Sequence, residues 1–333
     1  MNHWRLVDSG APPRRGADNM AIDRALVEGV EAGGPPTLRL YYWDPPCLSL
    51  GRNQLAAGIY DEAAAAARGI DIVRRPTGGR AVLHDREVTY SVVVPVGVLG
   101  SPRATYAAIN RALVAGLRRL GVVGELQGEG EGEGEGEGTG AEATALGPNP
   151  CFDGAAPGEV VAEGRKLIGS AQRREGSVLL QHGSLLLDGD QSAVVDLLRP
   201  HAGDHAGAAA LGPGAGLALA GALAPVAPPG AGARVVSAGV RPSGERGPDA
   251  PAAPPFPALA PPPFPALAPP PPATLRQLLG HVPERARLED ALVAGFVEAL
   301  GIGLAPDALS SAEREAARRW RELFGSAAWT WRR

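Results

Sequence analysis

The spacing of apolar and polar positions divides the chain into segments typical of helices and segments typical of strands. Apolar residues at helical intervals predict helices over 18–32, 61–68, 102–121 and 288–300, with Asp18 and Asp61 as caps of the first two. A capping box from Ser310 to Glu313 predicts one further helix. Runs rich in β-branched, aromatic and leucine residues predict strands over 37–42, 47–50, 70–74, 88–94, 165–172 and 177–187.

Strands and helices mix along the chain without strict βαβ alternation. We therefore expect an α/β (α+β) domain with a mixed sheet flanked by helices, and not a Rossmann fold. Residues 160–162 and 165–172 are predicted to form a hairpin, because Gly164 in the Glu163-Gly164 turn permits a positive φ. This hairpin places Lys166 near the start of the returning strand.

Two segments have a composition unsuited to folding. Residues 128–148 begin with a Gly-Glu repeat, and residues 201–272 consist mostly of Ala, Gly and Pro. Both lack the bulky apolar residues needed to offset the loss of chain entropy. We predict a single domain over 1–333 with low-complexity inserts at 128–148 and 201–272, and with 273–333 as a helical segment packed on the same domain.

Charge and hydropathy exclude several classes of protein. The formal charge is −4, and five of the glutamates lie in the Gly-Glu repeat, so the rest of the chain is close to neutral. This balance is not that of a nucleic-acid-binding protein. No signal peptide or long uninterrupted apolar run is evident, so we expect a cytoplasmic location without membrane contact. With two cysteines, a disulfide framework is not expected.

Lysine occurs once in this chain. Of the 32 Lys and Arg residues only Lys166 is a lysine, a bias that a GC-rich coding sequence produces. Arginine serves wherever a surface charge suffices, whereas a site that needs a compact amine cannot use a guanidinium. Lys166 is therefore a candidate for chemistry, and a chance surface lysine is the alternative of equal weight.

A glycine-containing polar segment occupies residues 74–85. Its two glycines let backbone N–H groups approach a ligand oxygen, and its arginines favour phosphate or carboxylate. Gly-Gly alone is weak evidence, and a histidine satisfied by neighbouring Asp85 is the simpler interpretation of His84. The candidate ligand-binding residues of this segment are Arg74, Arg75, Thr77, Gly78, Gly79 and His84.

The two cysteines differ in their surroundings. Cys151 lies in a segment with a proline before it (Asn149-Pro150-Cys151-Phe152-Asp153), which we predict to be a surface loop, so a role in packing the core is not expected. An ammonium near this thiol would raise its thiolate fraction. The one ammonium that a side chain can supply is that of Lys166. Cys47 starts an apolar strand, which favours a buried structural role.

Polar residues interrupt the apolar strand 177–187 at Gln181-His182-Gly183-Ser184. Polar groups in such a strand need partners. They either face a pocket or form a local network that supports the sheet, and the sequence leaves both open.

Taken together, these segments resemble the lipoate–protein ligase and octanoyltransferase family, which shares its catalytic domain with biotin–protein ligases. The family pattern is Arg-Arg-x-Thr-Gly-Gly with a following Val-x-His, then Gly-Arg-Lys-x-x-Gly-Ser-Ala-Gln, then Gln-His-Gly-Ser. The matching residues here are Arg74 to Gly79, Val82 to His84, Gly164 to Gln172, and Gln181 to Ser184. The opening residues 4–10 and 19–23 and the closing residues 329–331 fit as well.

The resemblance implies the biotin/lipoate protein ligase catalytic-domain fold and a single catalytic domain. It is closest to the cysteine-dependent octanoyltransferases, because Cys151-Phe152-Asp153 stands where these enzymes carry their nucleophile. It then implies transfer of octanoate from octanoyl-acyl carrier protein through a Cys151 thioester to a lysine of a lipoyl-domain protein, such as the glycine cleavage H protein. Cys151 would be the nucleophile, and Lys166 would donate to the acyl carbonyl.

The resemblance also implies a set of substrate-binding residues, and no metal or cofactor. Residues of the two glycine-containing segments would form the wall of the acyl tunnel, and His84 or His182 would assist the amine step without a ranking between them. The strand residues expected at the substrate are Gly169, Ser170, Ala171, Gln172, His182 and Gly183.

Two alternatives remain open from the sequence. An ATP-dependent lipoate ligase, which uses ATP and Mg²⁺, is suggested by the ligase-like Gly51-Arg52-Asn53-Gln54, whereas Arg80 and the short segment 273–333 favour the transferase. A non-catalytic paralogue that binds acyl carriers or lipoyl domains is the second alternative, and Cys151 and Lys166 argue against it.

Overall fold

A computed structural model describes residues 3–128, 152, 155–199 and 270–332. A mixed eight-stranded sheet has the order β11-β1-β2-β6-β10-β9-β8-β7. Its strands are β1 (His3–Val7), β2 (Thr37–Tyr41), β6 (Glu87–Pro95), β7 (Glu125–Leu126), β8 (Val160–Ala162), β9 (Arg165–Glu175), β10 (Val178–Leu186) and β11 (Gly303–Pro306). A second sheet has the order β4-β3-β5, with β3 (Cys47–Leu50), β4 (Asp71–Arg74) and β5 (Val82–His84).

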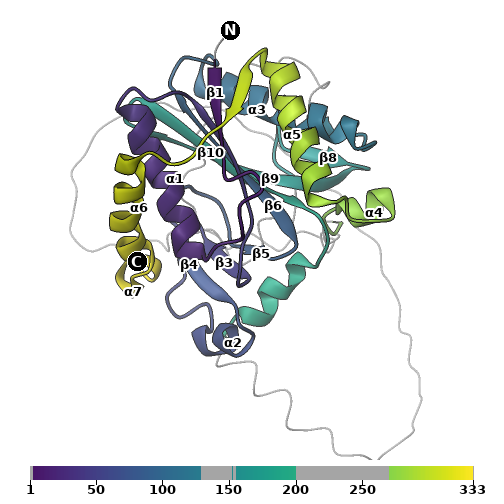
Figure 1. Cartoon of the computed structure of the whole chain (residues 1–333). Helices are drawn as coiled ribbons and strands as arrows, with labels where there is room; N and C mark the ends of the chain where they lie inside the picture. The colour runs from purple at the N-terminus through teal and green to yellow at the C-terminus, as the bar shows by residue number, and fades with distance from the viewer. Residues whose placement is uncertain (1–2, 129–151, 153–154, 200–269, 333) are drawn as a thin grey trace, which may run out of the picture. The chain divides into compact units, whose positions relative to one another are not determined.

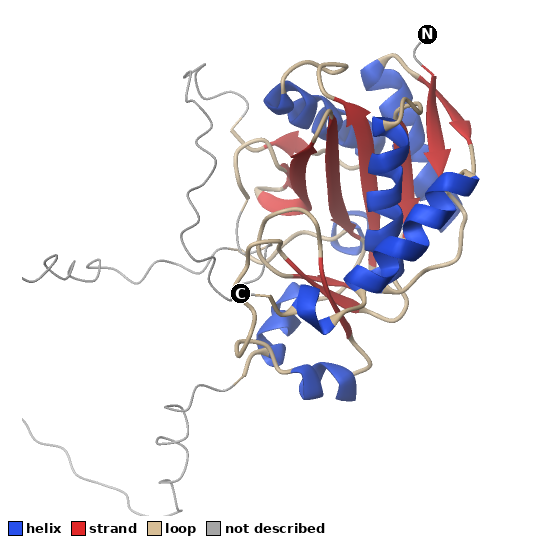
Figure 2. Ribbon diagram, turned by 90° about the vertical axis from the view of Figure 1, so that its left-hand side faces the viewer, coloured by secondary structure: helices blue, strands red, loops and turns tan. Residues whose placement is uncertain are grey.

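Helices cover both faces of the large sheet (Figures 1 and 2). On one face α1 (Gly16–Glu31) packs Ile22 and Leu26 against Val93 and Leu180, and α6 (Ser311–Phe324) lies along α1. On the other face α3 (Pro102–Arg119) and α5 (Arg285–Leu300) form the largest apolar core with β6 and β10. The shorter helices are α2 (Glu62–Ala67), the 3₁₀ helix η1 (Gln191–Leu197), α4 (Leu275–Leu279) and α7 (Ala327–Thr330).

The expected mixed sheet flanked by helices is confirmed. The predicted hairpin is present as β8 and β9, with Glu163 at φ 51° and Gly164 at φ 69° in its turn. Asp61 caps α2 through the N–H groups of Ala63 and Ala64, and the Ser310–Glu313 capping box is formed.

One prediction about the elements is wrong, and the strands β5 and β11 were not predicted. Asp18 does not cap the first helix, which begins at Gly16; its carboxylate pairs with Arg321 instead. The glycine-containing segment 74–85, for which no strand beyond residue 74 was predicted, contains the short strand β5. The C-terminal segment, expected to be helical, also contributes β11, which pairs with β1 in parallel. This edge strand escaped prediction because Gly303 and Pro306 are rare inside strands.

Candidate functional site

A narrow cavity lies between the two sheets, beside α1. Two segments far apart in the sequence meet there, the end of β4 with the loop that follows it and the paired strands β9 and β10. The residues singled out in the sequence that line it are Arg75, Gly79, His84, Gly169, Ser170, Ala171, His182 and Gly183. The lining also includes Met20, Tyr41, Trp43, Ser49, Val82, Thr89 and Ser184.

Strand register explains which side chains face this cavity. In the antiparallel pair, His182 lies opposite Ala171 and Ser184 lies opposite Gly169, so all four are on one face of the sheet. Gly183 must be a glycine, because a Cβ there would lie 2.3 Å from the carbonyl oxygen of Gly169.

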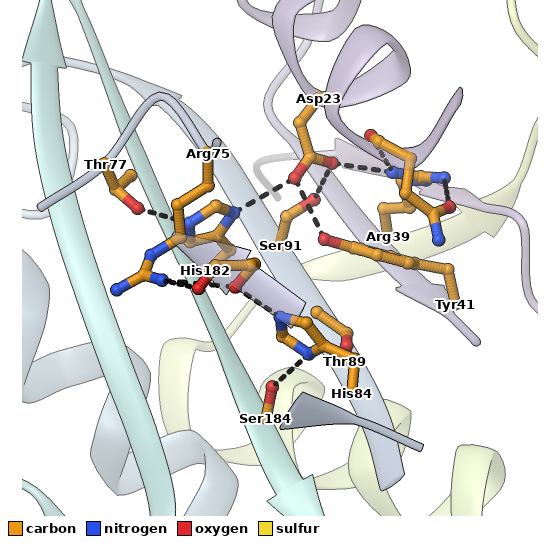
Figure 3. A network of polar contacts seen from close by, with 12 residues as sticks. Asp23, Arg39, Tyr41, Arg75, Thr77, His84, Thr89, Ser91, His182 and Ser184 are labelled. Atoms are coloured by element: carbon orange, nitrogen blue, oxygen red, sulfur yellow. Dashed lines mark hydrogen bonds and ion pairs between the residues drawn. The ribbon is translucent and has the colours of Figure 1, made fainter. Parts of the chain in front are cut away.

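His182 is held between a carboxylate and a hydroxyl (Figure 3). Its Nδ1 lies 3.1 Å from Asp23 Oδ2, and its Nε2 lies 2.5 Å from Thr77 Oγ1. Burial lowers the pKa of His182 and outweighs the opposing effect of Asp23, with Arg75 and His84 lowering it further. The neutral ring then donates Nδ1–H to Asp23 and accepts the Thr77 hydroxyl at Nε2.

Asp23 is one of the residues of this site that the sequence did not predict. It is fully buried on α1, where its carboxylate accepts from Arg39, Tyr41 and Ser91 as well as from His182 (Figure 3). Burial opposes its ionisation, but Arg39 and then His182 hold its pKa below the ordinary value. An acidic residue on the apolar face of a helix was the signal that could have revealed it.

His84 has a different carboxylate partner from the one expected. Its Nδ1 lies 2.7 Å from Glu87 Oε1, its Nε2 lies 2.7 Å from Ser49 Oγ, and its ring stacks on Trp43 at 3.9 Å. Asp85 is exposed. The expectation that Asp85 satisfies His84 is therefore wrong. Glu87 is the partner instead, because it begins the strand after the turn and its carboxylate reaches back to the His84 ring.

The interrupted strand serves both roles that the sequence left open. His182, Gly183 and Ser184 line the cavity, whereas Gln181 faces the α3 side, where its amide donates to Tyr90 Oη and to Asn110 Oδ1. Gln172 lies on that side as well, 3.2 Å from Gln181. Gln172, expected at the substrate, is instead part of a network that supports the sheet.

The two arginines of the first segment have separate tasks. Arg75 lines the cavity and fixes the glycine loop, donating to the carbonyl oxygens of Gly78 and Arg80. Arg74 is fully buried and donates to the carbonyl oxygens of Gly51, Gln54 and Thr330. Contrary to expectation, Arg74 points away from the cavity and ties two loops together. Gly78 is outside the lining, as is Thr77, which reaches the site through His182.

Lys166 is buried, so the interpretation as a chance surface lysine is wrong. Its ammonium lies 2.8 Å from Glu159 Oε2 and 5.1 Å from the centre of the Phe152 ring. Glu159 also accepts the N–H of Ala156. Glu159 was not predicted as a site residue, because it belongs to none of the motifs found in the sequence.

A β-bulge turns Lys166 toward the cavity side of the sheet. Val160 pairs with Ile168 while Val161 pairs with Lys166, so β9 holds one extra residue, Leu167. The extra residue reverses the alternation of side chains. A Cβ built on Gly169 would accordingly lie 3.3 Å from Lys166 Cε and 3.1 Å from the Phe152 ring.

Comparison with known proteins agrees with this geometry. Residues 15–210 match the model of the lipoyl protein ligase A/B catalytic domain. An octanoyltransferase LipM of Kyrpidia tusciae is 38% identical over 338 residues, covering all of both chains. One of Moorella thermoacetica is 47% identical over 189 residues, covering 55% of this chain and 65% of its own.

This chain belongs to the lipoyl protein ligase A/B family. Solved structures share its fold at low sequence identity. A lipoate–protein ligase A bound with ATP has a TM-score of 0.63 at 18% identity, covering 99% of this chain and 98% of its own. The putative lipoate protein ligase Ta0514 from T. acidophilum with bound lipoic acid has a TM-score of 0.60 at 18% identity, covering 99% of each chain.

Of the two cysteines of this family member, Cys47 lies within the described residues. Cys47 is a free thiol fully buried against Gly16 and Val73, and burial raises its pKa well above the ordinary value, which agrees with the structural role predicted. Cys151 lies outside the described residues. Its neighbour Phe152 is described and is buried among Val82, Leu186 and Lys166.

Within the described ranges, no helix is both long and apolar enough to span a bilayer.

Proposed function

We propose that this octanoyltransferase moves an octanoyl group from octanoyl-acyl carrier protein to Cys151, and then to a lysine of a lipoyl-domain protein such as the glycine cleavage H protein. Octanoyl transfer in protein lipoylation is the activity that the LipM relatives support. The thioester route, the two protein partners, the absence of a cofactor and a cytoplasmic location are part of the proposal.

The observation that carries the proposal is the contact between Lys166 and Phe152. The ammonium lies 5.1 Å from the ring of the residue that directly follows Cys151, and both side chains are on the cavity side of the sheet. A cation this close to the loop favours the thiolate of Cys151. The same cation can stabilise the oxyanion that forms when the thiolate attacks the donor carbonyl.

The first half-reaction exchanges one thioester for another. The Cys151 sulfur forms a bond to the acyl carbon, the tetrahedral intermediate collapses, and the donor thiolate leaves and takes up a proton. Because a thioester is replaced by a thioester, the exchange is nearly isoenergetic and needs no ATP. The acyl chain would occupy the cavity beside Gly169 and His182.

The second half-reaction needs a neutral amine on the acceptor lysine. The ordinary pKa of a lysine is about 10.4, so a base must remove a proton as the amine attacks the Cys151 thioester. His182 is suited to this task, because its ring is neutral and its Nδ1–H is fixed on Asp23. Its Nε2 becomes available once the Thr77 hydroxyl turns away.

Nucleotide-free acylation tests the proposal. The full chain is incubated with octanoyl-acyl carrier protein and its intact mass is measured, with Cys151→Ser as the variant and Cys47→Ser as the matched control. We expect one octanoyl adduct in the wild type and in Cys47→Ser, and none in Cys151→Ser. No adduct from octanoyl-acyl carrier protein, with octanoylation of a lipoyl-domain acceptor only from free octanoate with ATP and Mg²⁺, would instead establish the ligase reaction.

A further inference from the structure

A second cavity is bordered by Pro76, the first residue of the 76–79 loop. It is lined by Arg24, Arg52, Pro76, Arg173, Glu175, Trp320, Leu323, Phe324 and Trp329. Arg332 lies beside it, with its guanidinium 3.8 Å from the centre of the Trp329 ring. Arg52, Arg173 and Arg332 are called the arginine cluster below.

The positive charge of the arginine cluster is poorly neutralised. Glu175 pairs with both Arg24 and Arg173, so one carboxylate is shared between two cations. For Arg52 and Arg332, the described part of the chain supplies no carboxylate within ion-pair distance. Arg332 donates to the backbone carbonyl of Arg52, which brings the two cations together.

Electrostatics shows the cost of this arrangement. The pKa of Arg52 is lowered, mainly by burial and next by the charges of Arg173 and Arg332. The pKa of Arg332 is also lowered, mainly by burial and next by the charge of Arg173. The buried Arg74 beneath them has its pKa lowered to about 10, by burial and then by Arg332 and Arg75. Like charges held together in a partly buried site repel, and a bound anion would relieve that repulsion.

The chemistry of the arginine cluster favours a phosphate. Guanidinium groups present several N–H donors in a planar fork, and phosphate oxygens accept such forks well. Arg332 and Arg52 both lie over the ring of Trp329, with their guanidinium carbons 3.8 Å and 5.7 Å from its centre.

The arginine cluster is directly connected to the main cavity. Arg173 Nη1 donates to the carbonyl oxygen of Pro76, and the next residue, Thr77, contacts His182. Arg173 also lies on β9 with Lys166, and the bulge at Leu167 puts both on the same face of the sheet.

The separation of Arg173 from Lys166 fits the arm of an acyl donor. Their Cα atoms are about 20 Å apart along the strand. By extended-chain dimensions, a 4′-phosphopantetheine arm spans roughly 15 Å from phosphorus to sulfur. The long side chains of Arg173 and Lys166 can cover the difference.

We propose that the arginine cluster binds the phosphate of the arm that carries the acyl thioester, and so sets the position of the thioester carbon at Cys151 and Lys166. This inference rests on the proposed octanoyl transfer. It also gives a role to Arg52, whose segment resembles that of the ligases, and to the closing residues 329–332.

Two small donors that differ by the phosphate test the inference. Octanoyl-4′-phosphopantetheine and octanoyl-pantetheine are compared as acyl donors to Cys151 in the wild type and in Arg52→Gln/Arg332→Gln. Arg173 is kept, because it holds Pro76. The matched control is Arg287→Gln, an exposed arginine on α5 across the sheet. In the double variant, kcat/KM should fall roughly tenfold or more with the phosphorylated donor and remain unchanged with octanoyl-pantetheine.

Other outcomes overturn the assignment. An equal fall in kcat/KM with both donors would mean that the substitutions disturb the fold. An unchanged kcat/KM with both would mean that the phosphate binds elsewhere. A loss seen only with the carrier protein would assign the arginine cluster to carboxylates of the carrier. If ATP competes with the phosphorylated donor in the wild type but not in the variant, the phosphate bound belongs to a nucleotide. Wild-type enzyme that takes an octanoyl group neither from these donors nor from octanoyl-acyl carrier protein would count against octanoyl transfer itself.

Discussion

Lys166 owes its position to two buried neighbours, the Glu159 carboxylate and the Phe152 ring. An ammonium taken out of water needs such partners, because its desolvation is costly. Glu159 also accepts the N–H of Ala156, so it joins β9 to the segment that follows Cys151. The pair therefore holds the Lys166 ammonium beside Phe152 and Ala156.

Glu159→Gln tests this positioning role. The amide keeps the size of the side chain but loses the charge that orients Lys166, so we expect the rate of Cys151 acylation to fall about tenfold. The donor KM should stay the same, and Glu159→Asp should recover part of the rate. The control is Glu163→Gln in the turn of the same hairpin, where the carboxylate is 70% exposed. Equal rates in Glu159→Gln and wild type would remove Glu159 from this role.

His182 predicts a pH dependence of stability. An unfolded histidine has the ordinary pKa of 6.5, and burial lowers the folded value. Between the two pKa values the unfolded chain binds one more proton at this residue than the folded chain. The contribution of His182 to the free energy of unfolding is therefore complete above pH 6.5 and is lost as the pH falls toward the folded pKa. Urea unfolding should show that the free energy of unfolding falls more between pH 7.5 and pH 5.5 in the wild type than in His182→Gln. An identical loss would show that His182 is freely protonated in the folded protein.

At the scale of elements, the bulge in β9 decides which residues meet. Without the extra residue Leu167, the alternation of the strand would place Lys166 on the α3 side of the sheet, away from Phe152. Gly169 completes the arrangement, because the Phe152 ring and the Lys166 chain pass over its Cα. The element thus holds the cation, the glycine and the cavity wall on one face.

Gly169→Ala should separate the loop from the strand. Its Cβ would come within 3.1 Å of the Phe152 ring and 3.3 Å of Lys166 Cε, so one of them must move. We expect acylation of Cys151 to slow by about tenfold or more, since small displacements at a reacting centre are costly. Gly124→Ala is the matched control, with its Cβ 3.2 Å from Leu117 Cδ1 in a different part of the fold. If both variants keep the wild-type rate in a stopped-flow assay, the close packing over Gly169 is not required.

At the scale of the whole molecule, the site joins segments that the sequence could identify but not connect. The resemblance to the ligase and transferase family predicted the cavity walls, because Arg75, Gly79, Gly169 and His182 belong to the matching motifs. It could not predict Asp23 or Glu159, whose roles depend on which side chain lies across a helix–sheet or strand–loop contact. Arg74 and Gln172 belong to the same motifs as true lining residues, yet they point elsewhere, because alternate positions on a strand face opposite sides.

The fold followed from the pattern wherever local signals were strong. Capping residues and the positive φ of Gly164 set the ends of helices and the hairpin turn. The strand β11 was missed because its pairing with β1 is made across the whole chain and leaves no local trace. Long-range hydrogen bonds likewise connect the closing residues 329–332 with Arg74 and Arg52.

The central claim is that Cys151 and Lys166 act on one acyl carbonyl, and a single-turnover assay of Lys166→Arg tests it most directly. Octanoyl-acyl carrier protein is mixed with excess enzyme, and the octanoyl thioester on Cys151 is followed by rapid quench and intact mass. The account predicts a rate at least about 100-fold below wild type, because the guanidinium keeps the charge but cannot take the place of the compact ammonium. A Lys166→Arg variant that acylates Cys151 within about threefold of the wild-type rate would contradict it.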